Sequence, residues 1–242
     1  MNRENELLTL RQRARTLLDL SAPRDGLAAY YALYHDPART RLWLSQTGDG
    51  FLAVCQTGRD LFRLLAVLRA ARAESAGELL EQALVAGRPY YLLTTPELRA
   101  AVEEALTIER LEVNRIYRLD LRRYVPTLNV LVTPAPSASG TPRFVIRAQG
   151  QVAAEAGINW QSPHFAEVYV WTAPEVRGRG WGKAVVDGCV AWIIRAGAQP
   201  LYIVAEDNEP SIRLAESIGF VDSGARELAV EGVRRDHALA DS

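Results

Sequence analysis

The stretch VWTAPEVRGRGWGKAVV, residues 170–186, constrains the fold of this chain more than any other segment. An apolar run typical of a strand meets a proline, and a helical pattern begins shortly afterwards. Glycine permits positive φ and lets a ligand approach the backbone, and the unpaired N–H groups of a helix N-terminus attract anions. The stretch predicts a strand–turn–helix unit with an anion site, although a tightly packed turn with solvated arginines gives the same pattern. The glycines and basic residues at the turn are Gly178, Gly180, Gly182, Arg177, Arg179 and Lys183.

Spacing excludes two common phosphate-binding loops. The P-loop pattern G-x-x-x-x-G-K-[ST] fails because neither serine nor threonine follows Lys183. The dinucleotide pattern G-x-G-x-x-G fails because its last position is Lys183 or Val185, depending on the starting glycine. The pattern that fits is R-x-x-G-x-G, formed by Arg177, Gly180 and Gly182.

This pattern and its surroundings resemble the GNAT superfamily, the acyl-CoA-dependent N-acetyltransferases. The match covers residues 143–230, where an acidic strand residue, a proline and the turn are followed by NEPSIRLAESIGF. That downstream segment is similar to the family's N-x-x-[AS]-x-x-L and G-F positions. The sequence VWTAPEVRGRG is most similar to a branch that includes glycine acyltransferase-like members. The downstream residues in register are Asn208, Ser211, Leu214, Gly219 and Phe220.

The resemblance implies that acetyl-CoA or another acyl-CoA binds between two splayed parallel strands, residues 166–172 and 200–204. The pantetheine arm would pair with free backbone groups as an added strand does. Asn208 would bind the pantetheine or phosphate arm, unless it only caps the helix that follows. The backbone of the turn would hold the pyrophosphate. The implied cofactor-binding residues are Val170, Trp171, Thr172, Arg177, Gly178, Arg179, Gly180, Trp181, Gly182, Lys183 and Asn208.

Glu167 is the candidate catalytic residue. It matches the strand carboxylate that serves the family as a base, so the resemblance implies that it accepts the proton of the acceptor amine, directly or through water. A salt-bridged or surface glutamate is the alternative. Strand alternation places Glu167, Tyr169 and Trp171 on one face, where Tyr169 or Trp171 would either line the acceptor site or pack in the core.

The chain departs from the family at Ala215. Many members carry a tyrosine there, which protonates the leaving thiolate. Tyr202 and His164 are candidates to replace it, and a core tyrosine and a surface histidine are the plainer interpretations. A thiol of pKa ~8.5 also leaves tolerably as a thiolate near neutral pH.

Strand and helix patterns alternate in both halves of the chain, which predicts the α/β class with a mixed α+β sheet. We expect a GNAT catalytic domain in residues 125–242 and a degenerate GNAT-like or accessory domain in residues 1–124. The N-terminal half repeats the order hairpin, strand, helix, strand, helix, strand, but it has no R-x-x-G-x-G and is expected to bind no CoA. Residues 134–142, PAPSASGTP, predict a loop.

The net charge of −1 gives no basic field for nucleic acid. No run approaches the ~20 apolar residues of a membrane span, and the charged N-terminus lacks the apolar core of a signal peptide. Cys55 and Cys189 lie in apolar segments and are expected to be buried free thiols of a cytoplasmic protein. The histidines His35, His164 and His237 show no metal-ligand spacing.

The resemblance implies an N-acyltransferase that moves an acyl group directly from acyl-CoA to a small-molecule or peptide amine, and the composition predicts that it is cytoplasmic. We expect no metal, no nucleic acid and no membrane partner, and the oligomeric state is left open. The alternative is a non-catalytic CoA-binding or regulatory module, which Ala215 and the degenerate N-terminal half favour.

Overall fold

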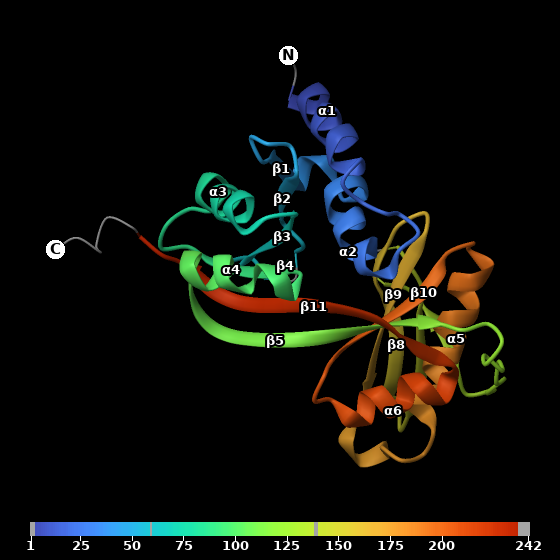
Figure 1. The fold of residues 1–242 in the computed structure, drawn as a ribbon. Coiled ribbons are helices and arrows are strands. Elements are labelled where there is room, and N and C mark those ends of the chain that lie inside the picture. Colours follow the sequence, from blue (N-terminus) through green and yellow to red (C-terminus); the bar gives the residue numbers. More distant parts are fainter. Residues whose placement is uncertain (1–2, 59, 138–139, 237–242) are drawn as a thin grey trace. The chain divides into compact units, whose positions relative to one another are not determined.

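The computed structural model describes residues 3–58, 60–137 and 140–236. The chain forms two compact units (Figure 1). Unit 1 comprises Met1–Asn114 and Arg226–Ser242, and unit 2 comprises Arg115–Ala225. Each unit has parallel and antiparallel strand pairs with helices packed on them, which confirms the predicted fold class.

Unit 1 consists of an antiparallel meander, β1–β2–β3, and a fourth strand, β4, which lies parallel to β3. Short 3-10 turns and one π-helical turn join these elements. The helices of unit 1 are α1 (Arg3–Arg15), α2 (Gly26–Ala29), α3 (Ala73–Ala83) and α4 (Arg99–Ala105), with η1 (Pro23–Asp25), η2 (Tyr30–Tyr34), η3 (Pro37–Arg39) and η4 (Pro96–Leu98). Its strands are β1 (Thr40–Leu44), β2 (Gly50–Cys55), β3 (Leu64–Ala70) and β4 (Pro89–Thr94).

Unit 2 repeats this succession. Strands β7, β8 and β9 form an antiparallel meander, and β10 lies parallel to β9. The repeat confirms the order of hairpin, strand, helix, strand, helix and strand that was predicted for the N-terminal half. The elements of unit 2 are β6 (Thr133–Ala135), β7 (Arg143–Ala148), β8 (Gln151–Gln161), β9 (Phe165–Thr172), η5 (Pro174–Val176), α5 (Trp181–Arg195), β10 (Gln199–Ala205) and α6 (Glu209–Ile218).

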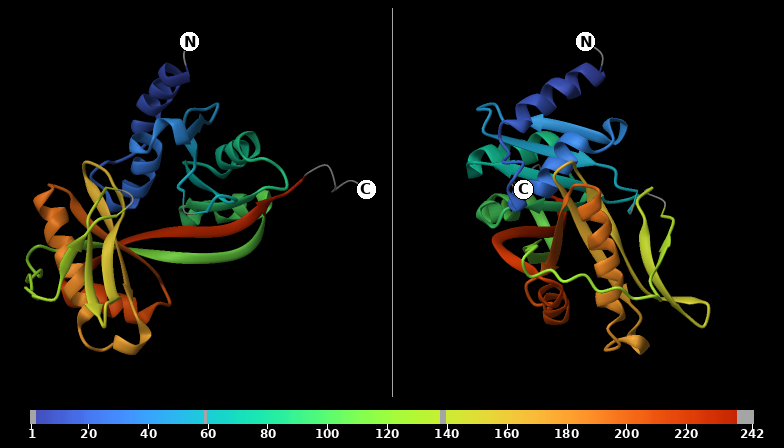
Figure 2. Two further views of the ribbon diagram at one scale, coloured as in Figure 1. Left: turned by 180° about the vertical axis from the view of Figure 1, so that it is seen from behind. Right: turned by 90° about the vertical axis from the view of Figure 1, so that its right-hand side faces the viewer.

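Two long strands contribute residues to both units. They are β5 (Leu106–Leu119) and β11 (Phe220–Arg234), which run side by side in Figures 1 and 2. In the strand order, β11 is the neighbour of β4 and β5 is the neighbour of β10. The units therefore do not follow chain order, and the predicted division between residues 124 and 125 stays a prediction.

Helix α5 covers one face of the unit 2 strands because its apolar residues recur every turn. Val185, Cys189 and Ile193 are fully buried and pack in one core with Ala166 and Val168 of β9. Each large apolar side chain buried in this way contributes about 1.5–3 kcal/mol. The alternate β9 residues lie outside that core, as strand alternation predicts. The face of β9 that carries Glu167 is therefore the face turned away from α5.

Strand β6 corrects the predicted loop at residues 134–142. Thr133–Ala135 pairs with β7 although it contains Pro134. The proline is tolerated because β6 is the last strand in the order, so that one of its edges needs no ladder partner. Residues 138 and 139 of that segment lie outside the described residues.

Gly219 ends α6 in the left-handed region, with φ 112°. A Cβ at this position would lie 2.9 Å from the backbone N of Tyr124. We expect Gly219→Ala to lower the free energy of unfolding by more than the roughly 1–2 kcal/mol that a left-handed alanine costs, because backbone cannot move aside. Urea denaturation measures the loss.

Gly224→Ala is the matched control for Gly219→Ala. Gly224 also has positive φ, 80°, but a Cβ there has nothing within 4 Å. Its replacement should cost only the conformational strain. Equal losses at the two positions would contradict the steric account of Gly219.

Candidate functional site

The turn before α5 leaves its backbone open. Gly178 and Gly180 have φ of +81° and +76°, and a Cβ at either residue would have nothing within 4 Å. Gly180 is the N-cap of α5, and as a glycine it has no side chain to cap the helix. A Cβ at Gly182 would instead meet Thr172 Oγ1 at 3.0 Å. The first two glycines therefore provide an accessible helix N-terminus, and the third allows the helix to pack closely on β9.

The basic side chains of the turn are held by groups of the protein. Arg177 Nε donates to the backbone O of Thr172 at 3.4 Å, and the Arg179 guanidinium lies 5.5 Å from the ring centroid of Trp181. Both arginines are exposed. The open turn thus has two cations beside it, as the sequence predicts, and each has a defined resting contact.

Lys183 is held differently from the two arginines. Its Nζ lies 3.5 Å from Oδ2 of Asp187, one turn further along α5. Asp187 is buried, and burial raises the pKa of its carboxyl although Lys183 opposes that shift. Sequence reasoning missed Asp187; the signal was an acidic residue four positions after the lysine, inside an apolar helix face.

Strands β9 and β10 separate at Glu167. Their parallel pairing runs from Phe165 with Gln199 to Glu167 with Leu201 and, in the described chain, goes no further. Both strands continue, β9 to Thr172 and β10 to Ala205. From residue 168 onward, the edge of β9 that faces β10 has backbone groups without a ladder partner. This is the splay that the resemblance implied, and it begins at the candidate base.

Glu167 is half-buried at the point where the strands separate. Its carboxylate Oε1 accepts a hydrogen bond from Asn159 Nδ2 at 2.8 Å. Trp160 of β8 pairs with Glu167 on one side and Leu201 of β10 on the other, and both are buried. Sequence reasoning missed Asn159 because nothing in the pattern of β8 indicates which residue faces Glu167.

The rest of this face of β9 is polar and partly exposed. Tyr169 lies over Gly157, where a Cβ would be 2.7 Å from the phenol oxygen, and the Tyr169 hydroxyl donates to Glu155 at 3.5 Å. Glu155 also accepts from Arg143 at 2.9 Å. Trp171 is 48% exposed. Tyr169 and Trp171 are therefore absent from the core under α5 and lie on the opposite, partly exposed face of β9.

The remaining residues that the sequence singled out lie in or next to β9, β10 and α6. Asn208 caps α6, because its Oδ1 accepts from Ser211 N at 3.2 Å. Ala215 is fully buried. The Tyr202 hydroxyl lies 2.8 Å from Ser211 Oγ, and the ring packs on Phe220 in the core. Val170 is half-buried against the same core. His164 is exposed.

In unit 1, side chains fill the place that corresponds to the splay. Pairing between β3 and β4 continues to Val67 and Leu93. The next carbonyl, that of Leu68, accepts from Thr94 Oγ1 at 3.0 Å and from Arg69 Nη1 at 2.9 Å. The buried Arg69 also lies 3.8 Å from the Asp25 carboxylate. A pantetheine amide could not pair with this carbonyl without displacing these groups.

The N-terminus of α3 in unit 1 carries a carboxylate of its own. Asp49, from the β1–β2 turn, accepts from Nε of the N-cap residue Arg72 at 2.8 Å and from Thr47 Oγ1 at 2.6 Å. Hydrogen bonds from Thr47, Arg72 and Ser75 hold the pKa of Asp49 well below its ordinary value. An anion that approached this helix would meet a negative charge, so unit 2 offers the better site for a phosphate.

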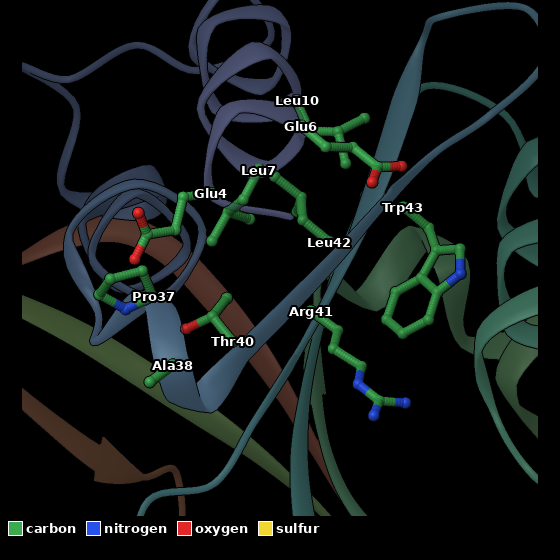
Figure 3. A pocket seen from close by; sticks show the side chains of 10 residues that line it. All are labelled: Glu4, Glu6, Leu7, Leu10, Pro37, Ala38, Thr40, Arg41, Leu42 and Trp43. Carbon is green, nitrogen blue, oxygen red and sulfur yellow. The ribbon is translucent and has the colours of Figure 1, made fainter. Parts of the chain in front are cut away.

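A hollow of about 760 Å³ lies in unit 1, between α1 and β1 (Figure 3). Leu7 and Leu10 enter it from the helix, and Arg41 and Trp43 from the strand. None of the residues predicted to bind the cofactor lines it. The hollow is therefore separate from the glycine turn and the splayed strands.

Two further properties bear on the predicted partners. In the described ranges, which exclude His237, no group of three or more His, Cys, Asp or Glu residues is placed to hold a metal ion. The helices of the same ranges include none with the length and apolar character needed to cross a membrane.

Cys55 and Cys189 are buried free cysteines, as predicted, and burial raises the pKa of each thiol to about 12.

Residues 110–220 match the sequence model of the Acetyltransferase (GNAT) family. They contain the splayed strands, Glu167 and the glycine turn together. Residues 110–220 are a GNAT domain. The resemblance inferred from the turn is thereby confirmed, and no curated protein matches the chain.

Solved structures extend the likeness of the fold beyond the GNAT domain. A putative GNAT-family acetyltransferase from Novosphingobium aromaticivorans is 20% identical, with a TM-score of 0.59, over 76% of this chain and 89% of that one. A GCN5-related N-acetyltransferase from Kribbella flavida is 17% identical, with a TM-score of 0.59, over 84% and 93%. A tandem GNAT protein from the clavulanic acid biosynthesis pathway is 16% identical, with a TM-score of 0.57, over 96% and 94%. At these identities they show the fold alone, and the tandem protein shares it across both units.

The Asp49 interactions give a pH-dependent stability. Because folding lowers the pKa of Asp49 below its ordinary value of 3.8, the stabilisation is present above pH 3.8 and is lost as the pH falls below it. We expect Asp49→Asn to melt below the wild type at pH 7, and the difference to shrink as the pH falls below 3.8. Thermal unfolding followed by circular dichroism at several pH values measures this.

Asp207→Asn, which removes an exposed carboxylate from unit 2, serves as the control for Asp49→Asn. Its melting temperature should follow that of the wild type at every pH. A wild-type advantage over Asp49→Asn that stays constant or widens in acid would contradict the role given to Asp49.

Proposed function

We propose that this protein is an acyl-CoA N-acyltransferase that moves an acetyl or other acyl group directly to the amine of a small molecule or peptide. The GNAT domain supports acyl transfer in general. The observation that carries the proposal is the separation of β9 from β10 at Glu167. This carboxylate lies where the paired part of the two strands ends and the unpaired edge of β9 begins. The glycine turn lies at the other end of that edge, where β9 leads into α5.

The residues present fit an acyl-CoA along this path. Backbone groups of Val170, Trp171 and Thr172 would pair with the amides of the pantetheine arm. The N–H groups of Gly178–Lys183 would hold the pyrophosphate, with Arg177 and Arg179 beside it. The backbone carbonyl of Thr172 already accepts a hydrogen bond from Arg177. It would bind the pantetheine arm only after this arginine turns toward the phosphate. Asn208 would contribute its side-chain amide while its oxygen caps α6.

Glu167 would accept the proton of the acceptor amine. The neutral nitrogen then forms a bond to the acyl carbon, the carbon–sulfur bond breaks, and the thiolate of CoA leaves. Backbone N–H groups of β9 next to Glu167 would donate to the acyl oxygen, on which negative charge develops in the transition state. The exposed face that carries Tyr169 and Trp171 would receive the acceptor. A covalent intermediate is not proposed, since the one thiol of unit 2, Cys189, is buried.

The second candidate is a CoA-binding module without catalysis. Ala215, which is fully buried, favours it, because this position supplies no proton to the thiolate. Tyr202 is not accessible as a replacement proton donor, since its hydroxyl is hydrogen-bonded to Ser211 and its ring is buried. Departure as a thiolate, helped by the nearby N-terminus of α6, is compatible with transfer. Consumption of acetyl-CoA with a panel of amines separates the two candidates.

Glu167→Gln tests the base. Turnover of acetyl-CoA with a responsive amine should fall about 10²-fold or more, because the amide cannot accept the proton. Glu155→Gln, which changes another carboxylate on the same face, is the control and should retain most of the activity. Steady-state rates with purified variants measure both, and full activity of Glu167→Gln would rule out the assignment.

Gly180→Glu tests the glycine turn. A negative side chain at the N-cap of α5 should repel the pyrophosphate and weaken CoA binding about 100-fold, which calorimetry measures. Gly197→Glu is the control, since Gly197 has a similar φ, 82°, equally open space, and lies beyond the other end of α5. It should bind CoA as the wild type does. Unchanged binding by Gly180→Glu would place the phosphates elsewhere.

A further inference from the structure

The ladder between β8 and β9 has one irregularity, and it lies at Glu167. Ile158 pairs with Val168, but the next pair joins Trp160 to Glu167. Asn159 is therefore an extra residue in β8, a β-bulge that sets two residues of one strand opposite one residue of the other. Bulges redirect side chains, so this one determines what Glu167 meets.

The bulge changes the face on which the following residues lie. Without it, Trp160 would pair with Ala166 and join the core under α5. With it, Trp160 pairs with Glu167 and lies outside that core. Glu167 consequently has a buried apolar neighbour on each side, Trp160 and Leu201, and the side chain of Asn159 within hydrogen-bond distance.

Asn159 is chemically suited to hold a base. Its Nδ2 only donates, so the bond of 2.8 Å to Oε1 favours the ionised carboxylate over the protonated acid. The same bond restricts the rotation of the half-buried Glu167 side chain. Among the described residues, the titratable groups on this face include Tyr169 of β9 and, beyond it, Glu155 of β8 with its partner Arg143 of β7.

We propose that Asn159 is a positioning residue, which the bulge in β8 places against Glu167 to keep that carboxylate ionised and aimed at the acceptor amine. The proposal rests on the proposed function, because Glu167 must act as a base for its position to matter. It explains why β8 is irregular at this one point of its ladder with β9. Asn159 would not touch the substrate but would act through Glu167.

The test uses Asn159→Leu, which keeps the size of the side chain and removes the donor. Carboxyl NMR of the full chain with ¹³C-labelled glutamate, assigned with Glu167→Gln, follows the titration of Glu167 without any acceptor. We expect the midpoint of Glu167 to rise by about one pH unit in Asn159→Leu. With a responsive amine, the acid limb of the kcat/KM profile should move by the same amount, while the KM for acyl-CoA stays unchanged.

Gln161→Leu is the matched control, since it removes an amide from β8 two residues further on, opposite Ala166. It should leave both the titration and the profile as in the wild type. Thermal melts show whether each variant is folded, and Asn159→Asp serves if Asn159→Leu is not: a second carboxylate there should raise the Glu167 midpoint further.

The outcomes separate the two proposals. An unchanged Glu167 titration in a folded Asn159→Leu variant overturns the positioning role, whatever the activity. A shifted titration with an unshifted kcat/KM profile overturns it as well, because the carboxylate is then held for some other purpose. Full activity of Glu167→Gln overturns the proposed base first, and it does so independently of the titration. Shifts in both titration and profile support the proposal.

Discussion

A backbone N–H or C=O that is removed from water needs a hydrogen-bond partner, and both units of this chain depend on how that requirement is met where two parallel strands separate. In unit 2 the edge of β9 past Glu167 has no partner from β10. In unit 1 the corresponding carbonyl, that of Leu68, is bonded by Thr94 and Arg69. One fold thus produces an open edge that can pair with a ligand and a closed edge that contributes to stability.

The same contrast holds at the helix that follows each of these strands. The N-terminus of α5 has glycines with open space and exposed arginines, whereas that of α3 has an aspartate bonded to its N-cap arginine. The Asp49 carboxylate provides an internal anion at the N-terminus of α3, and its hydrogen bond from Arg72 ties the β1–β2 turn to that helix. The two units therefore share a topology. They differ in whether side chains of the protein occupy the strand edge and the helix N-terminus, as they do in unit 1.

The sequence predicted the glycine turn well because positive φ and an uncapped helix N-terminus are local properties. Gly178 and Gly180 could be identified from spacing alone, whereas the splay of β9 from β10 came only from the family resemblance. The contacts of Glu167 could not be predicted. They depend on a one-residue bulge in β8, and the apolar pattern of β8 is compatible with pairing in either register. The contacts of Asn159 and Trp160 with Glu167 therefore could not be predicted. Lys183 was predicted to meet phosphate, whereas the structure pairs it with Asp187 four residues further on, at a spacing that the prediction did not use.

Tertiary structure also decides where the chain could be divided. Residues Arg115–Leu119 of β5 belong to unit 2 and Arg226–Arg234 of β11 belong to unit 1, so unit 2 is one continuous segment, whereas unit 1 is completed by residues that follow unit 2 in the chain. A fragment that begins at residue 125 would keep β10 and lose its neighbour in the strand order. Such a bare edge favours association with other chains. Because Arg226–Arg234 follow unit 2 in the chain, unit 1 can be completed only after the whole of unit 2 has been synthesised.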